Sequence, residues 1–235
     1  MTATATASAG TDLAWKQRYD RDGFLNFGRI LSPQELEALS QRVDAICAGN
    51  SLVPAGNIKY YEHLEGTDPS SMISSVWQVL GSHQFDEVVM RVCEHPRIAS
   101  LVTVLLGVPG QLLTSQIITK PAGHGEQIPW HQDSSYWGPR RVVTCWLAID
   151  DATPENGCMR MIPGSHLAGQ LEFHPKRYPS IRAELLEAIR VDESRQVHVP
   201  VPAGCASFHT HYTLHASSRN TTARRRRAIA VTFGA

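Results

Sequence analysis

The sequence lacks the closely spaced cysteine pairs that bind structural metals or form the disulfides of small secreted proteins. The five cysteines are odd in number and widely spaced, and no CxxC occurs. Structural zinc sites and disulfide frameworks depend on close or regular cysteine spacing, so neither is expected. We therefore expect reduced, buried thiols and a cytoplasmic protein.

Long apolar runs and an excess of one charge are absent as well. The stretch LVTVLLGV at 101–108 falls well short of the roughly 18 apolar residues that cross a membrane. Basic and acidic residues number 22 each, so the formal net charge is zero. This balance predicts no general attraction to nucleic acid or to an acidic membrane. No pattern indicates an oligomeric state.

The glycine motifs of several large enzyme classes are also missing. The sequence contains no Walker loop, no dinucleotide-binding glycine loop and no GxSxG motif. The first two loops bind phosphates through backbone N–H groups, and GxSxG presents a nucleophilic serine. Nucleotide-dependent chemistry of these types and serine hydrolysis are therefore not indicated.

The composition is that of a globular protein, with 42% hydrophobic and 19% charged residues among 235. This length suits one domain with a sizeable core better than two very small ones. The opening MTATATASAGT lacks the basic start, apolar core and arginines of targeting peptides. We therefore expect a disordered tail over 1–11 and a single domain over 12–235.

Helical signals dominate the first half of this domain. Ser32 and Glu35 flank Pro33 in the pattern of a capping box, which predicts a helix that ends at Gly49. Apolar residues recur at helical spacing inside it. The other expected elements are a helix over 12–20, a strand over 23–30, a largely irregular segment over 50–85, and helices over 86–94 and 97–106.

Short β-like runs separated by turns fill the second half. One helix is expected to interrupt them, capped by Ser180, with Ile181, Leu185, Leu186 and Ile189 on its apolar face. Helices followed by many short strands predict an α+β fold that contains a β-sandwich or barrel. The expected strands are 112–119, 129–133, 141–150, 158–162, 196–201, 205–209, 213–217 and 226–233.

His131-Gln132-Asp133 is the first chemically informative motif. On a strand, residues i and i+2 point to the same face, so His131 and Asp133 would converge while Gln132 points out. Two histidines and one carboxylate on one face of a metal leave its other positions open, as in non-haem iron oxygenases. HxD alone is weak evidence, and a second histidine from another strand must complete the site. Residue spacing does not choose among the candidates His198, His209, His211 and His215.

The HxD motif lies in the first of three distinctive stretches, WHQDSSYW (130–137), TCWLAIDDATPENGCMRMIPGSH (144–166) and HASSRNTTARRRRA (215–228). Together they resemble the phytanoyl-CoA dioxygenase family of Fe(II)- and 2-oxoglutarate-dependent oxygenases. The GFLNFGRILSPQELEAL opening (23–39) is similar to the family's N-terminal element, so the resemblance runs over most of 12–234. It implies a double-stranded β-helix core, also called a jelly roll or cupin-like fold, with N-terminal and flanking helices.

The resemblance also implies the remaining ligands. It makes His215, 82 positions after Asp133, the third iron ligand. It makes Arg226, eleven positions after His215, the residue that binds the distal carboxylate of 2-oxoglutarate. Ser217 is similar to the family's hydroxyl that assists this carboxylate. The resemblance also matches Lys120, Thr144 and Trp146 to other residues that contact the co-substrate or line the pocket in this family.

A run of four arginines, 224–227, is often a solvated basic surface. This run leads into the alternating strand RAIAVTF, where Arg226 shares a face with Ala228 and Ala230. Small neighbours leave room for a ligand, and a guanidinium binds a carboxylate through two parallel hydrogen bonds. These features agree with the position that the resemblance implies, so we expect Arg226 to bind the co-substrate and the other three arginines to lie at the surface.

The substrate pocket is expected to have aromatic walls and a few polar anchors. Two aromatic residues follow the HxD motif directly, and others lie in the irregular segment, from which they could cover the site. His166 ends the PGSH motif, which in the family lies near the active site. Core packing is an equal alternative for each aromatic residue. The candidate substrate contacts are Tyr136, Trp137, Trp77, Tyr61 and His166.

These features predict an oxygenase that uses Fe(II), 2-oxoglutarate and O2 to oxidise a small organic molecule. The expected outcome is hydroxylation or related C–H chemistry such as cyclisation, desaturation or epimerisation, and the family's breadth suggests a specialised metabolite as substrate. Two alternatives remain. One is a non-oxidative relative that binds a metal or ligand without turnover, and the other is a zinc-type hydrolase that uses the same three residues. Arg226 has no evident role in such a hydrolase.

Overall fold

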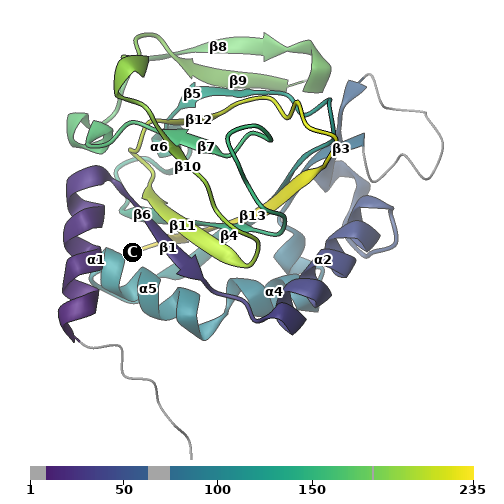
Figure 1. Ribbon diagram of the computed structural model, residues 1–235, viewed down its shortest axis with the longest axis horizontal. Coiled ribbons are helices and arrows are strands. Elements are labelled where there is room, and N and C mark those ends of the chain that lie inside the picture. The colour runs from purple at the N-terminus through teal and green to yellow at the C-terminus, as the bar shows by residue number, and fades with distance from the viewer. Residues whose placement is uncertain (1–8, 63–74, 182) are drawn as a thin grey trace, which may run out of the picture.

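Two antiparallel sheets form a double-stranded β-helix, and helices cover one side of it (Figure 1). The computed structural model describes residues 9–62, 75–181 and 183–235. The predicted α+β class and jelly-roll core are confirmed, and all five cysteines are buried and unpaired as expected. Among the described residues, no helix is both long and apolar enough to span a bilayer.

The larger sheet has seven strands in the order β1-β11-β6-β13-β4-β3-β2. At its centre β13 pairs with β4, with Arg226 opposite Lys120 at one end of the ladder. Two of its strands, β2 and β3, lie in the segment predicted to be largely irregular. The strands are β1 (Phe24–Arg29), β2 (Ile58–Tyr60), β3 (Val76–Leu80), β4 (Gln111–Lys120), β6 (Val142–Ala148), β11 (Cys205–Thr210) and β13 (Arg226–Gly234).

The smaller sheet has four strands in the order β10-β7-β12-β5, and a separate hairpin of β8 and β9 lies beside β5 (Figure 1). The pairing of β12 with β5 places His215 directly opposite His131. The strands are β5 (Ile128–His131), β7 (Met159–Met161), β8 (Phe173–Tyr178), β9 (Ala183–Ala188), β10 (Val197–Val199) and β12 (His215–Ser217).

Two apolar clusters lie on opposite faces of the larger sheet, because successive side chains of a strand point to opposite faces. Ile229 and Val231 of β13 belong to the cluster that packs against the helices. Ala228 and Ala230 belong to the other cluster, which faces Met161 of the smaller sheet. The alternation predicted for this strand is thus confirmed, and its small residues lie on the inner face.

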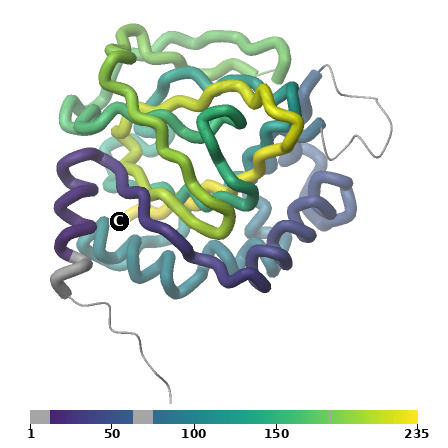
Figure 2. The backbone as a smooth tube through the Cα atoms, in the orientation of Figure 1, coloured from purple at the N-terminus to yellow at the C-terminus, as the bar shows by residue number. Residues whose placement is uncertain are grey.

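Four helices lie along the outer face of the larger sheet (Figures 1 and 2). The capping box predicted at the second of them is present: Ser32 Oγ accepts from Glu35 N, and the Glu35 carboxylate accepts from Ser32 N. The first helix begins three residues before the predicted boundary at 12, and residues 1–8 of the predicted tail lie outside the described residues. The helices are α1 (Ala9–Asp22), α2 (Pro33–Cys47), α4 (Glu87–Cys93) and α5 (Pro96–Leu106).

The helix predicted to begin at Ser180 is wrong, because the residues that follow it form β9, which pairs along its whole length with β8. The spacing of Leu185 and Leu186 fits a helical face and a buried strand alike, and local periodicity does not separate the two. Pairing with β8 favours the strand, because it provides hydrogen-bond partners for backbone N–H and C=O groups of both strands. It also lets Leu185 pack against the cluster that contains the buried Trp77. Ser180 instead donates to the Glu126 carboxylate at 2.7 Å.

The surface position predicted for Arg227 is also wrong. Arg227 is only 4% exposed and donates to both carboxylate oxygens of Asp150, to Asp44 and to Ser40. These bonds tie α2 to the end of β13. Its neighbours Arg224 and Arg225 are exposed as predicted. Arg227 is buried because the face of β13 opposite the cavity meets a helix that carries two acceptors for it.

We expect Arg227→Met to lower the free energy of unfolding by about 2 kcal/mol. Removing one partner of a buried ion pair leaves the other unpaired, and partial exposure of Asp44 and Asp150 reduces the loss. Urea denaturation measures the change. The matched control is Arg225→Met, at an exposed arginine that also pairs with Asp44, and it should cost less than about 1 kcal/mol. Equal losses in the two variants would contradict the structural role given to Arg227.

Candidate active site

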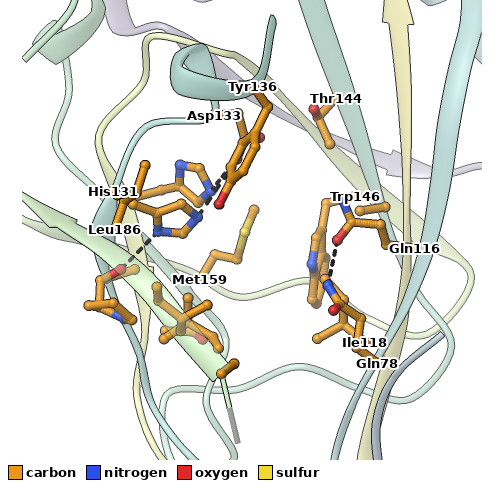
Figure 3. Close-up of a pocket in the computed structure, with 18 of the residues that line it drawn as sticks. Gln78, Gln116, Ile118, His131, Asp133, Tyr136, Thr144, Trp146, Met159 and Leu186 are labelled. Carbon is orange, nitrogen blue, oxygen red and sulfur yellow. Dashed lines mark hydrogen bonds and ion pairs between the residues drawn. The ribbon is translucent and has the colours of Figure 1, made fainter. Parts of the chain in front are cut away.

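A cavity of about 630 Å³ lies between the two sheets. Trp146 and Thr144 line it from the larger sheet, and His131 and Met159 line it from the smaller one (Figure 3). Leu186 and other residues of β9 line a further side, so the hairpin forms part of its wall. The site predicted from the HxD motif opens into this cavity.

Three side chains of the predicted metal site meet at the cavity wall. Oδ1 of Asp133 lies 3.7 Å from His131 Nε2 and 3.9 Å from His215 Nε2. One ligand atom from each of the three residues lies within 4.8 Å of the others, and this is the one such metal-ligand group found among the described residues. Two imidazoles and a carboxylate suit a divalent transition metal. The donor set therefore fits iron.

The local geometry of the HxD motif differs from the prediction. Strand β5 ends at His131, and Asp133 takes a helical conformation (φ −77°, ψ −9°) at the start of the short helix α6 (Ser134–Trp137). Gln132 is fully buried, and its amide donates to the carbonyls of Gly169 and Tyr212. His131 and Asp133 therefore converge through a turn anchored by Gln132, and not through strand alternation.

Backbone carbonyls orient both imidazoles. Nδ1 of His131 lies 2.8 Å from the carbonyl of Pro129, and Nδ1 of His215 lies 2.9 Å from the carbonyl of Thr213. A proton on each Nδ1 satisfies these contacts and leaves both Nε2 lone pairs directed at the Asp133 side chain. Such a contact to the second ring nitrogen is the usual support of a metal-binding histidine.

The protonation states also suit metal binding. Burial lowers the pKa of His131 to about 4 and lowers the pKa of His215, so both rings are neutral near pH 7. Burial acts to raise the pKa of Asp133, but His209, His215 and His131 outweigh it and hold that pKa well below its usual range. Neutral imidazoles and an ionised carboxylate are the forms that bind metal without first releasing a proton.

The other candidate histidines occupy different places. His198 is exposed on β10 and is not among the residues that line the cavity. His211 is buried, and its ring packs against Tyr212. His209 on β11 is buried next to the three residues, with Nε2 3.7 Å from Oδ2 of Asp133. The structure therefore groups His215 with the HxD pair and places His209 beside that group.

Arg226 enters the same cavity and is only 1% exposed. Its Nη2 donates to the carbonyl of Gly157 at 2.9 Å, whereas Nε and Nη1 are buried with no hydrogen-bond partner among the described residues. Its guanidinium carbon lies 5.3 Å from the centre of the Trp146 ring, and burial lowers its pKa to about 10. A buried cation with unpaired donors requires an anion. The site therefore fits the distal carboxylate of 2-oxoglutarate.

The other predicted co-substrate residues divide into two groups. Ser217, Thr144 and Trp146 line the cavity. Lys120 is buried beside Arg226 behind the lining, and its ammonium donates to the carbonyl of Glu126. Burial and the nearby Arg226 charge lower the pKa of Lys120 well below its usual value. Lys120 thus lies next to Arg226 without entering the cavity wall, in surroundings that favour its neutral form.

The candidate substrate contacts divide in the same way. Trp77, Tyr136 and Trp137 line the cavity, and Tyr136 is 64% exposed. Figure 3 shows Tyr136 beside Asp133. Tyr61 is buried behind the lining, where its hydroxyl accepts from the backbone of Glu126. His166 lies outside the lining, and its Nε2 contacts the carbonyl of Asp20 in α1 at 3.0 Å. The structure therefore places Tyr61 and His166 away from any direct substrate contact in this cavity.

Several lining residues were not singled out from the sequence. The amides of Gln78 and Gln116 bond to each other at 2.8 Å across β3 and β4 (Figure 3). Thr232 of β13 contacts Thr144 at 3.3 Å. Alternation along β13 could have identified Thr232, which shares the inner face with Arg226. The Gln78 position carried no signal, because its strand lay in a segment predicted to be irregular.

The chain matches known proteins over most of its length. A family model described as phytanoyl-CoA dioxygenase (PhyH) matches residues 19–228. L-proline trans-4-hydroxylase of Streptomyces griseoviridis is 31% identical, over 93% of this chain and 84% of that protein. The peroxisomal phytanoyl-CoA dioxygenase of Mus musculus is 28% identical, over 94% of this chain and 68% of that protein.

Solved structures show the same architecture. EvdO2 from Micromonospora carbonacea var. aurantiaca, crystallised with 2-oxoglutarate, gives a TM-score of 0.75 at 24% identity and covers 100% of this chain and 94% of its own. The epimerase SnoN, in complex with Fe3+, alpha ketoglutarate and nogalamycin RO, gives a TM-score of 0.73 at 22% identity. The match covers 97% of this chain and 84% of the SnoN chain. At these identities the likeness shows the fold.

Proposed function

The chain belongs to the phytanoyl-CoA dioxygenase (PhyH) family, and on that premise we propose that His131, Asp133 and His215 bind Fe(II) while Arg226 binds 2-oxoglutarate. The protein is an Fe(II)- and 2-oxoglutarate-dependent dioxygenase. In this proposal residues 12–235 form one catalytic domain, and the cavity between its sheets holds co-substrate and substrate together.

When bound, iron and 2-oxoglutarate supply an oxidant made from O2, with release of succinate and carbon dioxide, that attacks a C–H bond of the substrate. The residues of the chain bind and orient the reactants. His131 and His215 present Nε2, fixed by Nδ1 contacts to backbone carbonyls. Arg226 orients the co-substrate through its distal carboxylate, and Ser217 lines the same cavity. The hairpin residue Leu186 limits the access of water.

The proposal rests on the buried Arg226 guanidinium, two nitrogens of which have no partner among the residues that the structure describes, and which lies in the cavity that also holds the three candidate ligands. A hydrolytic zinc site needs no such cation and gains nothing from its burial. A non-catalytic binding protein would have no reason to keep both an open metal site and a carboxylate site within one cavity. The oxygenase uses both groups in one reaction.

We propose a small, polar specialised metabolite as the substrate and hydroxylation or related C–H chemistry as the outcome. The cavity volume of about 630 Å³ must hold 2-oxoglutarate as well. Neutral hydrogen-bonding groups, the Gln78–Gln116 amides, face aliphatic side chains such as Leu186 of the hairpin. Two relatives are named L-proline trans-4-hydroxylase and ectoine dioxygenase, so small amino-acid-like compounds are the first substrates to test.

The wild-type protein should form succinate from 2-oxoglutarate only when both Fe(II) and O2 are present. A panel of amino acids, cyclic amino acids and polyketide-like compounds is incubated in air and anaerobically, with Fe(II) or with Zn(II), and succinate is quantified by mass spectrometry. Substrate consumption is followed in the same samples, and the metal controls separate the oxygenase from a zinc hydrolase, which would consume substrate without O2 and without forming succinate. The absence of O2-dependent succinate, coupled or uncoupled, across the panel would refute the proposal.

A further inference from the structure

One buried histidine near the proposed iron ligands, His209, forms no side-chain hydrogen bond within the part of the chain that the structure describes. His209 is 1% exposed, and neither of its ring nitrogens has a hydrogen-bond partner among the described residues. An imidazole buried in this way loses its bonds to water without replacement, which is unfavourable unless a polar group pairs with it in the working state. The ring lines the cavity, with its centroid 4.7 Å from that of His215.

The two oxygens of Asp133 face different neighbours. Oδ1 lies 3.7 Å from His131 Nε2 and 3.9 Å from His215 Nε2, whereas Oδ2 lies 3.7 Å from His209 Nε2. The last separation is longer than a hydrogen bond. Hydrogen bonds at such sites are often long before ligands bind and shorten afterwards. A small rotation of the carboxylate brings Oδ2 within reach of His209.

We propose that His209 is a positioning residue, whose Nε2–H donates to Oδ2 of Asp133 so that Oδ1 alone is presented between His131 and His215. The inference rests on the proposed iron site. A carboxylate held in this way cannot offer both oxygens to the metal. The positions that the co-substrate and O2 require therefore stay open.

Cobalt(II) binding tests this role without relying on turnover. His209→Leu should weaken Co(II) affinity by about 10- to 100-fold, the range found when a residue that supports a metal ligand is removed. It should also change the visible absorption of bound Co(II), because Oδ2 becomes free to enter the coordination shell. His209→Gln keeps an N–H donor and should bind within about threefold of wild type, with the wild-type spectrum.

The matched control is His211→Leu. His211 is also buried, with no hydrogen bond to its ring nitrogens among the described residues, but its ring packs on Tyr212 and not on His215, so its replacement should change affinity and spectrum much less than His209→Leu does. Thermal melting checks that each variant folds. The wild type provides a second measurement: in Zn(II)-loaded protein with nitrogen-15-labelled histidine, His209 should carry its proton on Nε2. That measurement stands if His209→Leu does not fold.

Each of the following outcomes would overturn the inference. Wild-type affinity and spectrum in His209→Leu would show that Asp133 needs no such support. Equal losses in His209→Leu and His211→Leu would show a general packing effect. An unprotonated Nε2 on His209 would exclude the bond or make His209 a ligand itself. If the wild type does not bind Co(II) at all, both the proposed metal site and this inference are wrong. If Co(II) binding is lost in His131→Ala but kept at wild-type strength in His209→Leu, only this inference is wrong.

Discussion

Replacing His131 with alanine should reduce O2-dependent succinate formation by about 10³-fold or more, since metal assistance contributes several kcal/mol to such reactions. The variant keeps only two, Asp133 and His215, of the three proposed ligands. Fe(II) affinity should fall in parallel. Succinate formation and metal content after equilibration with Fe(II) measure the two effects. His215→Ala should behave in the same way, because the two rings stand opposite each other in the β5–β12 pairing.

The control for this prediction is His198→Ala. His198 was one of the four candidates for the second histidine ligand and is exposed on β10, outside the cavity lining. Its replacement should leave metal content and succinate formation at wild-type levels. Retained Fe(II) binding in His131→Ala, or a comparable loss in His198→Ala, would show that the metal is held elsewhere.

Arg226→Ala should raise the KM for 2-oxoglutarate by about 100-fold, which corresponds to about 2.7 kcal/mol of binding free energy. This value lies within the range for removing one partner of a buried, hydrogen-bonded charge pair. Its two unpaired nitrogens are the donors that a carboxylate would satisfy. The KM is obtained from initial rates of succinate formation over a range of 2-oxoglutarate concentrations. Arg224→Ala, at an exposed position in the same arginine run, is the matched control and should leave it unchanged.

Thermal melting separates loss of binding from loss of folding. Arg226 without an anion is an unpaired buried cation, so Arg226→Met should not lower the melting temperature in the absence of 2-oxoglutarate. Added 2-oxoglutarate should raise the melting temperature of the Fe(II)-loaded wild type and leave that of the variant unchanged, because only the state that binds a ligand is stabilised by it. Equal effects of Arg226 and Arg224 substitutions would mean that another cation binds the co-substrate.

Local sequence signals predicted the elements whose reasons are local. The capping box at Ser32 and Glu35 formed as expected, because its hydrogen bonds join residues three positions apart. Alternation along β13 placed Arg226 and Arg227 on opposite faces, because that alternation follows from strand geometry alone. The same patterns failed at β9, where the apolar spacing of Leu185 and Leu186 fits a helix and a strand equally well.

The partners of each side chain depended on tertiary structure. Arg227 was expected at the surface, and it is buried because α2 brings Asp44 to the outer face of the sheet. His166 and Tyr61 were expected near the substrate, and both are directed into contacts with distant segments instead. In each case the deciding residue lies far away in the chain, where local periodicity carries no information.

The sequence by itself determined the chemistry that this protein can hold: an HxD pair, a set of candidate second histidines, and one arginine on a strand face with small neighbours. Tertiary structure alone decided how those groups meet. The pairing of β5 with β12 places His215 opposite His131, the buried Gln132 anchors the turn that brings Asp133 to them, and the β8–β9 hairpin completes the cavity. The physical reason is that metal and co-substrate binding require a few atoms to lie within a few ångströms of each other, and contacts between distant strands set those distances.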